Sequence, residues 1–348
     1  MTRLPLMLAL TVPVLAFSAC SEDSTQPSAP GDQSPATPSF AIGSNTWTPK
    51  AALPVGPTEV ATGMVYDANG NSIVYSIGGR IDGGSTFAIQ AYTVAANTWT
   101  AKKSVTNVYN TNGVGKIGSR LYFTGGWDYG SGTPLAFGQT WAYDYANDRL
   151  IKKADMPKAT ADGVSGVISG KLYVLPGTCS GDQYPATRYC ADENIRTLFR
   201  YDPSTNTWAT RTSAPHFHRH AAAGVINGKL YVAGGALDFA QPNAYLDVYD
   251  PATNMWKTLA PLPTGNTLAS GAVVGNKLLV VSWAYNNGSP TIRTYSYDPA
   301  INKWTAKASP PNLGALARVA LNGKSYVISV GGTGSCCDSE LPSQLYTP

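Results

Sequence analysis

The sequence of 348 residues predicts an all-β fold built from six copies of one four-stranded unit, and two repeated motifs carry this prediction. The first motif recurs as "YDPSTNTW" (201–208), "YDPATNMW" (249–256) and "YDPAINKW" (297–304), with weaker copies "YTVAANTW" (92–99) and "YDYANDRL" (143–150). The second motif is a turn followed by an apolar run, and its six copies are "NSIVYSIGG" (71–79), "IGSRLYFTGG" (117–126), "ISGKLYVLPG" (168–177), "INGKLYVAGG" (226–235), "VGNKLLVVSW" (274–283) and "LNGKSYVISVGG" (321–332). A repeat near fifty residues, with short β-type runs and no long helical pattern, indicates stacked β-units.

Each unit divides into four strands, and the unit at 220–260 shows them in chain order. We predict strand a as "HAAAGVI" (220–226), strand b as "KLYVAGG" (229–235), strand c as "YLDVYDP" (245–251) and strand d as "MWKTLA" (255–260). The small residues of strand a suit a crowded innermost position, and "NGK" is typical of a tight hairpin turn. "PATN" joins strands c and d. The recurring tyrosines and tryptophans are expected to pack between sheets.

These residues resemble the kelch repeat, in which a tyrosine precedes a double glycine and a tryptophan follows further along the chain. The resemblance extends from Ser44 to Pro348 and implies a six-bladed kelch-type β-propeller with four-stranded blades. The chain finishes with "QLYTP", whereas the folded part starts with "SNTW" (44–47). We therefore expect the N-terminal strand to complete the last blade and close the ring.

The N-terminal region predicts export. Residues 1–19 combine Arg3, a short apolar stretch and small residues, which is the pattern of a signal peptide too short to span a bilayer. "AFSAC" resembles a lipobox, which implies lipidation of Cys20 and a place in a bacterial cell envelope; the alternative is a secreted or periplasmic protein. Residues 20–43 are rich in Ser and Pro and read as a flexible tether, followed by the propeller at 44–348.

Charge and composition limit the partners. The formal net charge is +4, and loss of Arg3 with the signal peptide leaves +3, with the charges interspersed. We expect no nucleic-acid partner, no membrane contact except through a lipid anchor, no cofactor, and a monomer. Phosphate-binding glycine loops, nucleophile elbows and EF-hand loops are not found in the sequence.

Four cysteines follow Cys20, and an even number in an exported protein favours disulfides. Three connectivities are open. We favour Cys179 with Cys190, which would staple the insertion of blade three, and therefore Cys336 with Cys337, although adjacent cysteines bond only through a strained ring.

All three histidines lie in "HFHRH" (216–220). If the strand extended back to Pro215, His216, His218 and His220 would alternate onto one side, as metal ligands on a strand do. The other interpretation is hydrogen bonding at a channel rim. Counting from the turn, the position of His220 recurs in the other blades as Glu59, Thr111, Asp162, Leu268 and Ala315, which would form a ring at the channel mouth.

Residues that occur in single blades are candidates for function, because residues that recur in every blade form the scaffold. Glu59, Arg80, Asp162 and His220 on one cleft could transfer protons on a sugar, or could be solvated loop charges. Further binding candidates, all aromatic except Asp128, follow strand b in two blades. They are Trp127, Asp128 and Tyr129 in blade two, and Trp283 and Tyr285 in blade five. They could stack on sugar rings or grip a peptide, or could cover the channel.

The sequence thus predicts a non-catalytic binding module for a glycan, peptide or partner protein. The alternative is a sugar-active enzyme similar to the six-bladed bacterial sialic acid mutarotases. Copper chemistry like that of galactose oxidase is not expected, because its histidines come from separate parts of the chain. A structural envelope protein, with the aromatic mouth as an assembly interface, is a third possibility.

Overall fold

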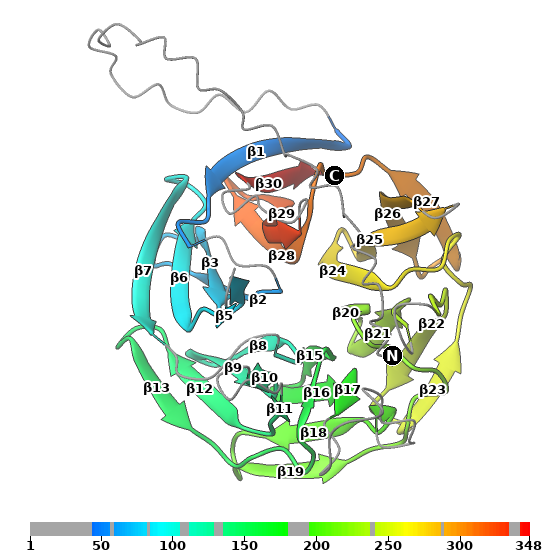
Figure 1. Cartoon of the computed structure of the whole chain (residues 1–348), viewed down its shortest axis with the longest axis horizontal. Coiled ribbons are helices and arrows are strands. Elements are labelled where there is room, and N and C mark those ends of the chain that lie inside the picture. Colours follow the sequence, from blue (N-terminus) through cyan, green and yellow to red (C-terminus); the bar gives the residue numbers. More distant parts are fainter. Residues whose placement is uncertain are drawn as a thin grey trace, which may run out of the picture. The chain divides into compact units, whose positions relative to one another are not determined.

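The computed structural model describes residues 44–55, 59–81, 84–104, 111–128, 135–179, 195–236, 241–286, 289–333 and 342–348. Within the compact unit Ile42–Pro348, the chain forms six antiparallel four-stranded sheets. Figure 1 shows them as blades around a central axis, following one another in chain order from blue to red. The predicted six-bladed β-propeller is confirmed.

Each blade runs from an innermost strand a to an outermost strand d. Blades 1 and 2 comprise β2 (Ala61–Tyr66), β3 (Ser72–Ile77), β6 (Ala88–Thr93) and β7 (Thr98–Ser104), then β8 (Val114–Ile117), β9 (Arg120–Thr124), β12 (Thr140–Asp144) and β13 (Arg149–Lys152). Blades 3 and 4 comprise β15 (Val164–Ile168), β16 (Lys171–Leu175), β18 (Phe199–Asp202) and β19 (Thr207–Thr210), then β20 (Ala222–Ile226), β21 (Lys229–Ala233), β22 (Leu246–Asp250) and β23 (Met255–Thr258). Blades 5 and 6 comprise β24 (Leu268–Val274), β25 (Lys277–Asn286), β26 (Ser289–Asp298) and β27 (Lys303–Lys307), then β28 (Leu313–Leu321), β29 (Lys324–Thr333), β30 (Pro342–Thr347) and β1 (Thr46–Ala52).

Three short strand pairs extend the loops that follow strand b or precede strand a. They are β4 (Arg80–Ile81) with β5 (Gly84–Ser85), β10 (Trp127–Asp128) with β11 (Leu135–Ala136), and β14 (Thr160–Ala161) with β17 (Thr178–Cys179). No helix in the described ranges has the length and apolar character needed to cross a membrane.

The ring closes through strands from the two ends of the propeller. Strand β1 pairs antiparallel with β30, in a register that places Thr46 opposite Thr347 and Trp47 opposite Tyr346. Figure 1 shows β1 along the outside of the last blade. The predicted closure is confirmed, and it covers the edge that β30 would otherwise expose.

The tight turns follow from their residues. Asn227 and Gly228 have φ values of 51° and 73°, as a type I′ hairpin requires, so "NGK" forms the predicted turn between β20 and β21. The glycines after β21 permit close backbone approach. A methyl group on Gly235 would lie 2.5 Å from the Arg219 carbonyl oxygen, and Gly235 itself has a φ of 89°.

The repeated "YDP…TNxW" motif joins each blade to the one before it. In blade 4 the Tyr249 hydroxyl donates to Asn254 Oδ1 at 2.7 Å, and the Trp256 indole donates to the Thr212 carbonyl of blade 3 at 2.8 Å. The same indole bond recurs from Trp47, Trp99, Trp208 and Trp304. Blade 2 has Leu150 in place of the tryptophan, but Tyr143 still donates, here to Asp148. The motif is therefore scaffold.

The hydrophobic core lies between neighbouring blades, as predicted for the tyrosines and tryptophans. Between blades 3 and 4, for example, Leu175, Leu230, Val232 and Tyr249 are buried together. Clusters of the same kind lie at four further junctions, such as that of Ile77, Phe123 and Tyr143 between blades 1 and 2. Apolar packing thus holds the blades together and leaves the strand a ends free to line the axis.

Candidate functional site

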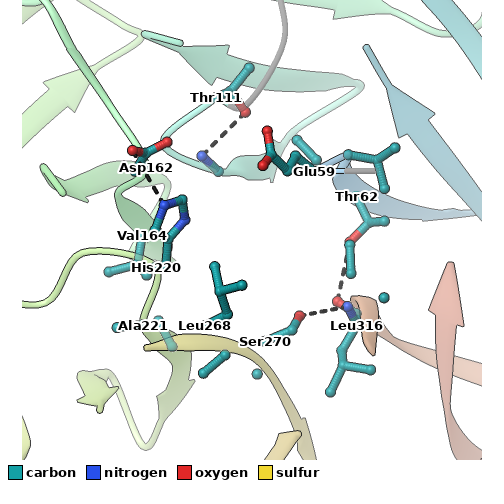
Figure 2. A pocket seen from close by; sticks show the side chains of 18 of the residues that line it. Glu59, Thr62, Thr111, Asp162, Val164, His220, Ala221, Leu268, Ser270 and Leu316 are labelled. Carbon is teal, nitrogen blue, oxygen red and sulfur yellow. Dashed lines mark hydrogen bonds and ion pairs between the residues drawn. The ribbon is translucent and has the colours of Figure 1, made fainter. Parts of the chain in front are cut away.

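A cavity of about 290 Å³ lies where the six innermost strands begin. All six residues of the predicted ring line it: Glu59, Thr111, Asp162, His220, Leu268 and Ala315. Figure 2 shows Glu59, Thr111, Asp162 and His220 around one side, and Leu268, Ser270 and Leu316 around the other. The cavity therefore has a side with ionisable groups and a mainly apolar side.

Backbone conformation separates three ring residues from the others. Glu59, Asp162 and His220 have φ values of 56°, 57° and 52°, in the left-handed region that residues other than glycine seldom adopt. Such a conformation costs about 1–3 kcal/mol and persists only where surrounding contacts hold it. The three residues with acid–base side chains therefore have a strained backbone at the point where the chain enters the propeller centre.

Hydrogen bonds around the axis hold these positions. The His220 amide donates to the Asp162 carbonyl at 2.8 Å, and the Ala269 amide donates to the His220 carbonyl at 2.8 Å, linking blades 3, 4 and 5. Across the apolar side, the Leu316 amide donates to Ser270 Oγ at 2.8 Å. Because neighbouring blades share these bonds, the ring geometry is fixed by the assembly rather than by any single loop.

The Asp162 carboxylate is buried, with 3% of the residue exposed, and its partners come from blades 2 and 4. The Trp127 indole donates to Oδ1 at 2.9 Å, and Arg219 Nε donates to Oδ2 at 2.9 Å. Arg219 Nη2 lies 2.8 Å from the same oxygen. His220 Nε2 lies 3.4 Å away. The guanidinium compensates the buried negative charge, which would be costly if it were unpaired.

The imidazole of His220 is neutral at neutral pH. Burial lowers its pKa below the ordinary 6.5; Asp162 opposes this shift and Arg219 reinforces it. A neutral imidazole beside a carboxylate can exchange a hydrogen bond with a hydroxyl group in the cavity.

His216 and His218 do not join His220. Strand β20 begins only at Ala222, so the alternation that would place all three on one side does not occur. His216 Nδ1 and His218 Nε2 each lie 2.9 Å from Asp247 Oδ2, and His218 Nδ1 lies 2.9 Å from the Gly234 carbonyl oxygen. Both nitrogens of His218 thus face oxygen atoms, which hold the ring from two sides.

Asp247 is the centre of this second network. Burial would raise the pKa of its carboxyl, but hydrogen bonds from His218, Thr258 and His216, together with the charge of His218, outweigh burial and lower it. The ring of His216 also stacks on Tyr245, with the centroids 3.5 Å apart.

No group of three or more His, Cys, Asp or Glu side chains in the described ranges is arranged to hold a metal ion. The first two histidines of "HFHRH" therefore hold the entry loop of blade 4.

The aromatic candidates have structural contacts where their side chains are described. Trp127 is half-buried and holds Asp162. Trp283 is also half-buried and packs against the core between blades 5 and 6. Several other candidates lie outside the described residues, either wholly or by their side chains: Cys20, Arg80, Asp128, Tyr129, Cys179, Cys190, Tyr285, Cys336 and Cys337.

Sequence reasoning did not single out Arg219 or the link from Trp127 to Asp162. Arg219 is a single-blade residue inside "HFHRH" and could have been noticed for that reason. Its partner, however, is 57 residues away in the chain, and only the placement of neighbouring blades brings the two together.

Comparisons with known proteins agree with this architecture. The Kelch motif matches residues 218–263. Kelch-like protein terF of Aspergillus terreus is 27% identical over 154 residues, covering 43% of this chain and 33% of that protein. Human Kelch-like protein 38 is 28% identical over 175 residues, covering 49% of this chain and 26% of that protein. The chain thus spans a third or less of the length of these relatives.

The solved structure of YjhT matches over 84% of this chain and 95% of its own, with a TM-score of 0.67 and 18% identity, which supports the fold alone. The protein is a six-bladed β-propeller with four-stranded blades. The matched motif and the relatives further support a propeller of the kelch type.

Proposed function

We propose that this protein is a non-catalytic binding module and that the central cavity receives one sugar unit of a glycan. The observation that carries the proposal is the two-sided cavity: Glu59, Asp162 and His220 offer hydrogen-bond partners, while Leu268 and Leu316 offer apolar surface. A sugar ring presents both hydroxyl groups and an apolar C–H face. Ligand sites commonly combine apolar walls with a few placed polar groups, and the kelch propeller fold is consistent with a binding module.

The test is isothermal titration calorimetry of the purified protein with a panel of monosaccharides that includes sialic acid and galactose. We expect a sugar to bind, and we expect Glu59→Gln and Leu268→Trp to abolish its binding, the first by removing an acceptor and the second by filling the cavity. Asp155→Asn and Met255→Trp are matched controls, because the Asp155 side chain is 56% exposed and Met255 is 63% exposed. Binding of no sugar, or binding unchanged in the cavity variants, would redirect the search to peptides and partner proteins.

The proposal includes an address, namely export and lipid anchoring at Cys20. It is supported by the signal-like residues 1–19, "AFSAC" and the Ser/Pro-rich segment that precedes the propeller. Labelling with a radioactive fatty acid in a bacterial host should mark the wild-type chain but not Cys20→Ala. Equal labelling of both would exclude lipidation at this cysteine, and a released, unlabelled wild type would support plain secretion.

A second candidate function is proton transfer on the bound sugar, as in the sugar-active alternative. It is favoured by one observation: a neutral His220 stands beside the Asp162 carboxylate on the same cavity as Glu59. Exchange between sugar anomers can be followed by NMR for each sugar that binds. Acceleration that is lost in Glu59→Gln or His220→Ala would make the protein an enzyme, whereas binding without acceleration would support the binding module.

A further inference from the structure

A second cavity, of about 890 Å³, opens at the other end of the innermost strands. Leu268 at the start of β24 lines the central cavity, whereas Val273 and Val274 at the end of β24 line this one. It runs between blades 5 and 6, the yellow-to-orange and orange-to-red sheets of Figure 1, and reaches Gly224 of blade 4.

The cavity exists because blade 6 lacks two side chains that fill this junction elsewhere. In blade 5, the cross-strand pair Val273 and Leu278 presses against blade 4: a methyl group on Gly224 would lie 2.5 Å from Val273 Cγ2 and 2.9 Å from Leu278 Cδ1. The equivalent pair of blade 6 is Ala320 and Ser325. Replacing a valine and a leucine by alanine and serine removes the bulk that seals the junction.

Two positions on the blade 5 side of the cavity also differ from the equivalent positions in blade 4. Leu279 stands where blade 4 has Tyr231, whose ring packs against Tyr297 of the next blade with the centroids 6.1 Å apart. Ser296 stands where blade 4 has Val248. Leu279 and Ser296 both line the cavity, together with the buried Tyr346 of blade 6. The walls are therefore apolar with hydroxyl groups set into them.

The cationic side chain of Arg318 also lines this cavity. Arg318 lies on the innermost strand β28, at a position where blades 3, 4 and 5 have the small residues Ser165, Ala223 and Gly271. Its guanidinium donates to Ser325 Oγ at 2.8 Å, so the arginine is held by the serine that replaced the leucine. The combination of this arginine with this serine occurs in blade 6 alone.

The charged side chains that line this cavity are the cations Lys277, Lys307 and Arg318. Lys307 lines the outer end, and no Asp or Glu side chain is found among the described residues that line it. In the described part of the chain, neither Arg318 nor Lys307 forms an ion pair with a carboxylate, whereas the third cation, Lys277, is paired with Asp298 at 2.8 Å. Arg318 is exposed, and an arginine that pairs with no carboxylate of the described residues, beside an apolar wall, matches an anionic head group attached to an apolar body.

We propose that this cavity binds an organic anion with an apolar body, whose head group pairs with Arg318 and whose body contacts Val225 and Val273, the half-buried apolar side chains of the lining. It is separate from the central cavity and does not depend on the function proposed for it. The test uses octanoate below its micelle concentration, with inorganic phosphate as an anion without an apolar part, in calorimetric titrations of the whole protein.

We expect octanoate to bind and phosphate to bind far more weakly. Arg318→Gln should weaken octanoate binding by about tenfold or more, since it removes a charge-assisted pair. Ser325→Leu should abolish it by filling the cavity, and because this change restores the residue of blades 2 to 5, it should also raise the melting temperature. The exposed Lys257→Gln and the central-cavity variant Leu268→Trp should bind octanoate like the wild type.

Three outcomes would overturn the proposal. They are no binding of octanoate, phosphate binding as tight as octanoate binding, and undiminished octanoate binding in a folded Ser325→Leu protein. The melting temperature of Ser325→Leu separates a filled cavity from a misfolded chain. Sugar binding at the central cavity is expected to be unchanged by Ser325→Leu, so failure of one proposal is distinguishable from failure of the other.

Discussion

At the scale of single residues, the two carboxylates near "HFHRH" divide the histidines between them. Asp247 binds His216 and His218 and belongs to the scaffold, whereas Asp162 lies beside His220 at the central cavity. Adjacent residues of one short run therefore serve different purposes. The backbone differs between them as well, because His220, unlike His216 and His218, has a positive φ, of 52°.

Asp247 should make the protein sensitive to acid. Its folded-state pKa lies below the ordinary 3.8, so its contribution to stability is complete above about pH 4 and is lost as the pH falls through the lowered value. Asp247→Asn should lower the free energy of unfolding by about 3 kcal/mol at pH 7, because the amide cannot replace all the hydrogen bonds that the buried carboxylate forms with His216, His218 and Thr258. Urea unfolding from pH 7 to pH 3 checks both points. A variant as stable as Asp155→Asn would contradict the assignment.

His220 should contribute at a higher pH. Because burial lowers its folded-state pKa below 6.5, the unfolded chain takes up a proton more readily, and stability falls as the pH drops below about 6.5. His220→Gln should remove this part of the pH dependence while leaving the loss of stability near pH 4. Melting temperatures measured between pH 8 and pH 5 test it, and an unchanged slope in the variant would show that His220 is not the group responsible.

At the scale of the strand and turn, the turn between strands c and d relies on one asparagine in five blades and on Asp148 in blade 2. Asn254 has a φ of 56° and accepts from the Tyr249 hydroxyl. It also accepts from the Thr212 amide of the preceding blade at 3.4 Å. The side chain therefore stabilises the turn of its own blade and the link to the blade before it.

Two substitutions separate these contributions. Asn254→Gly loses the side-chain bonds but tolerates the positive φ, so it should cost about 1–2 kcal/mol of unfolding free energy. Asn254→Ala loses the same bonds and adds left-handed strain, and should cost about 1 kcal/mol more. Chemical denaturation of the two variants gives the difference directly. Equal stabilities would mean that the turn relaxes to another conformation in the alanine variant.

The repeats predicted the elements well because scaffold residues recur at fixed spacing. Turn positions, and with them the ring of residues now found around the cavity, could be read from six copies of one motif, and tyrosine and tryptophan positions from five copies of the other. Strand a does not extend back to Pro215, which was the condition for placing all three histidines on one side, because the chain enters blade 4 through a left-handed residue that the pattern does not reveal. The pairing of Arg219 with Asp162 also needs the relative placement of two blades.

At the scale of the whole molecule, stability depends on closure of the ring. Trp47 of β1 donates to the Ala308 carbonyl of blade 5 at 2.8 Å and packs on Tyr346 with the centroids 5.0 Å apart. The strand therefore joins blade 5 to blade 6 as well as completing blade 6. A propeller without it would carry the unpaired edge of β30.

Trp47→Ala should lower the free energy of unfolding of the entire propeller by about 3–4 kcal/mol, in a single transition, because the blades depend on one another. Thermal unfolding followed by circular dichroism and by tryptophan fluorescence should shift together. Separate transitions for the two signals would instead indicate that blade 6 opens independently of the rest. Trp256→Ala, in the middle of the chain, is the matched comparison.

Pairing of Thr46 with Thr347 also sets an order of events during biosynthesis. The ribosome makes β1 before the other strands of the propeller and β30 after them, so the first strand has no partner until the strands between them have been made. Loop closure over such a separation is slow compared with hairpin formation. Prematurely terminated chains that lack β30 would keep an unpaired β1.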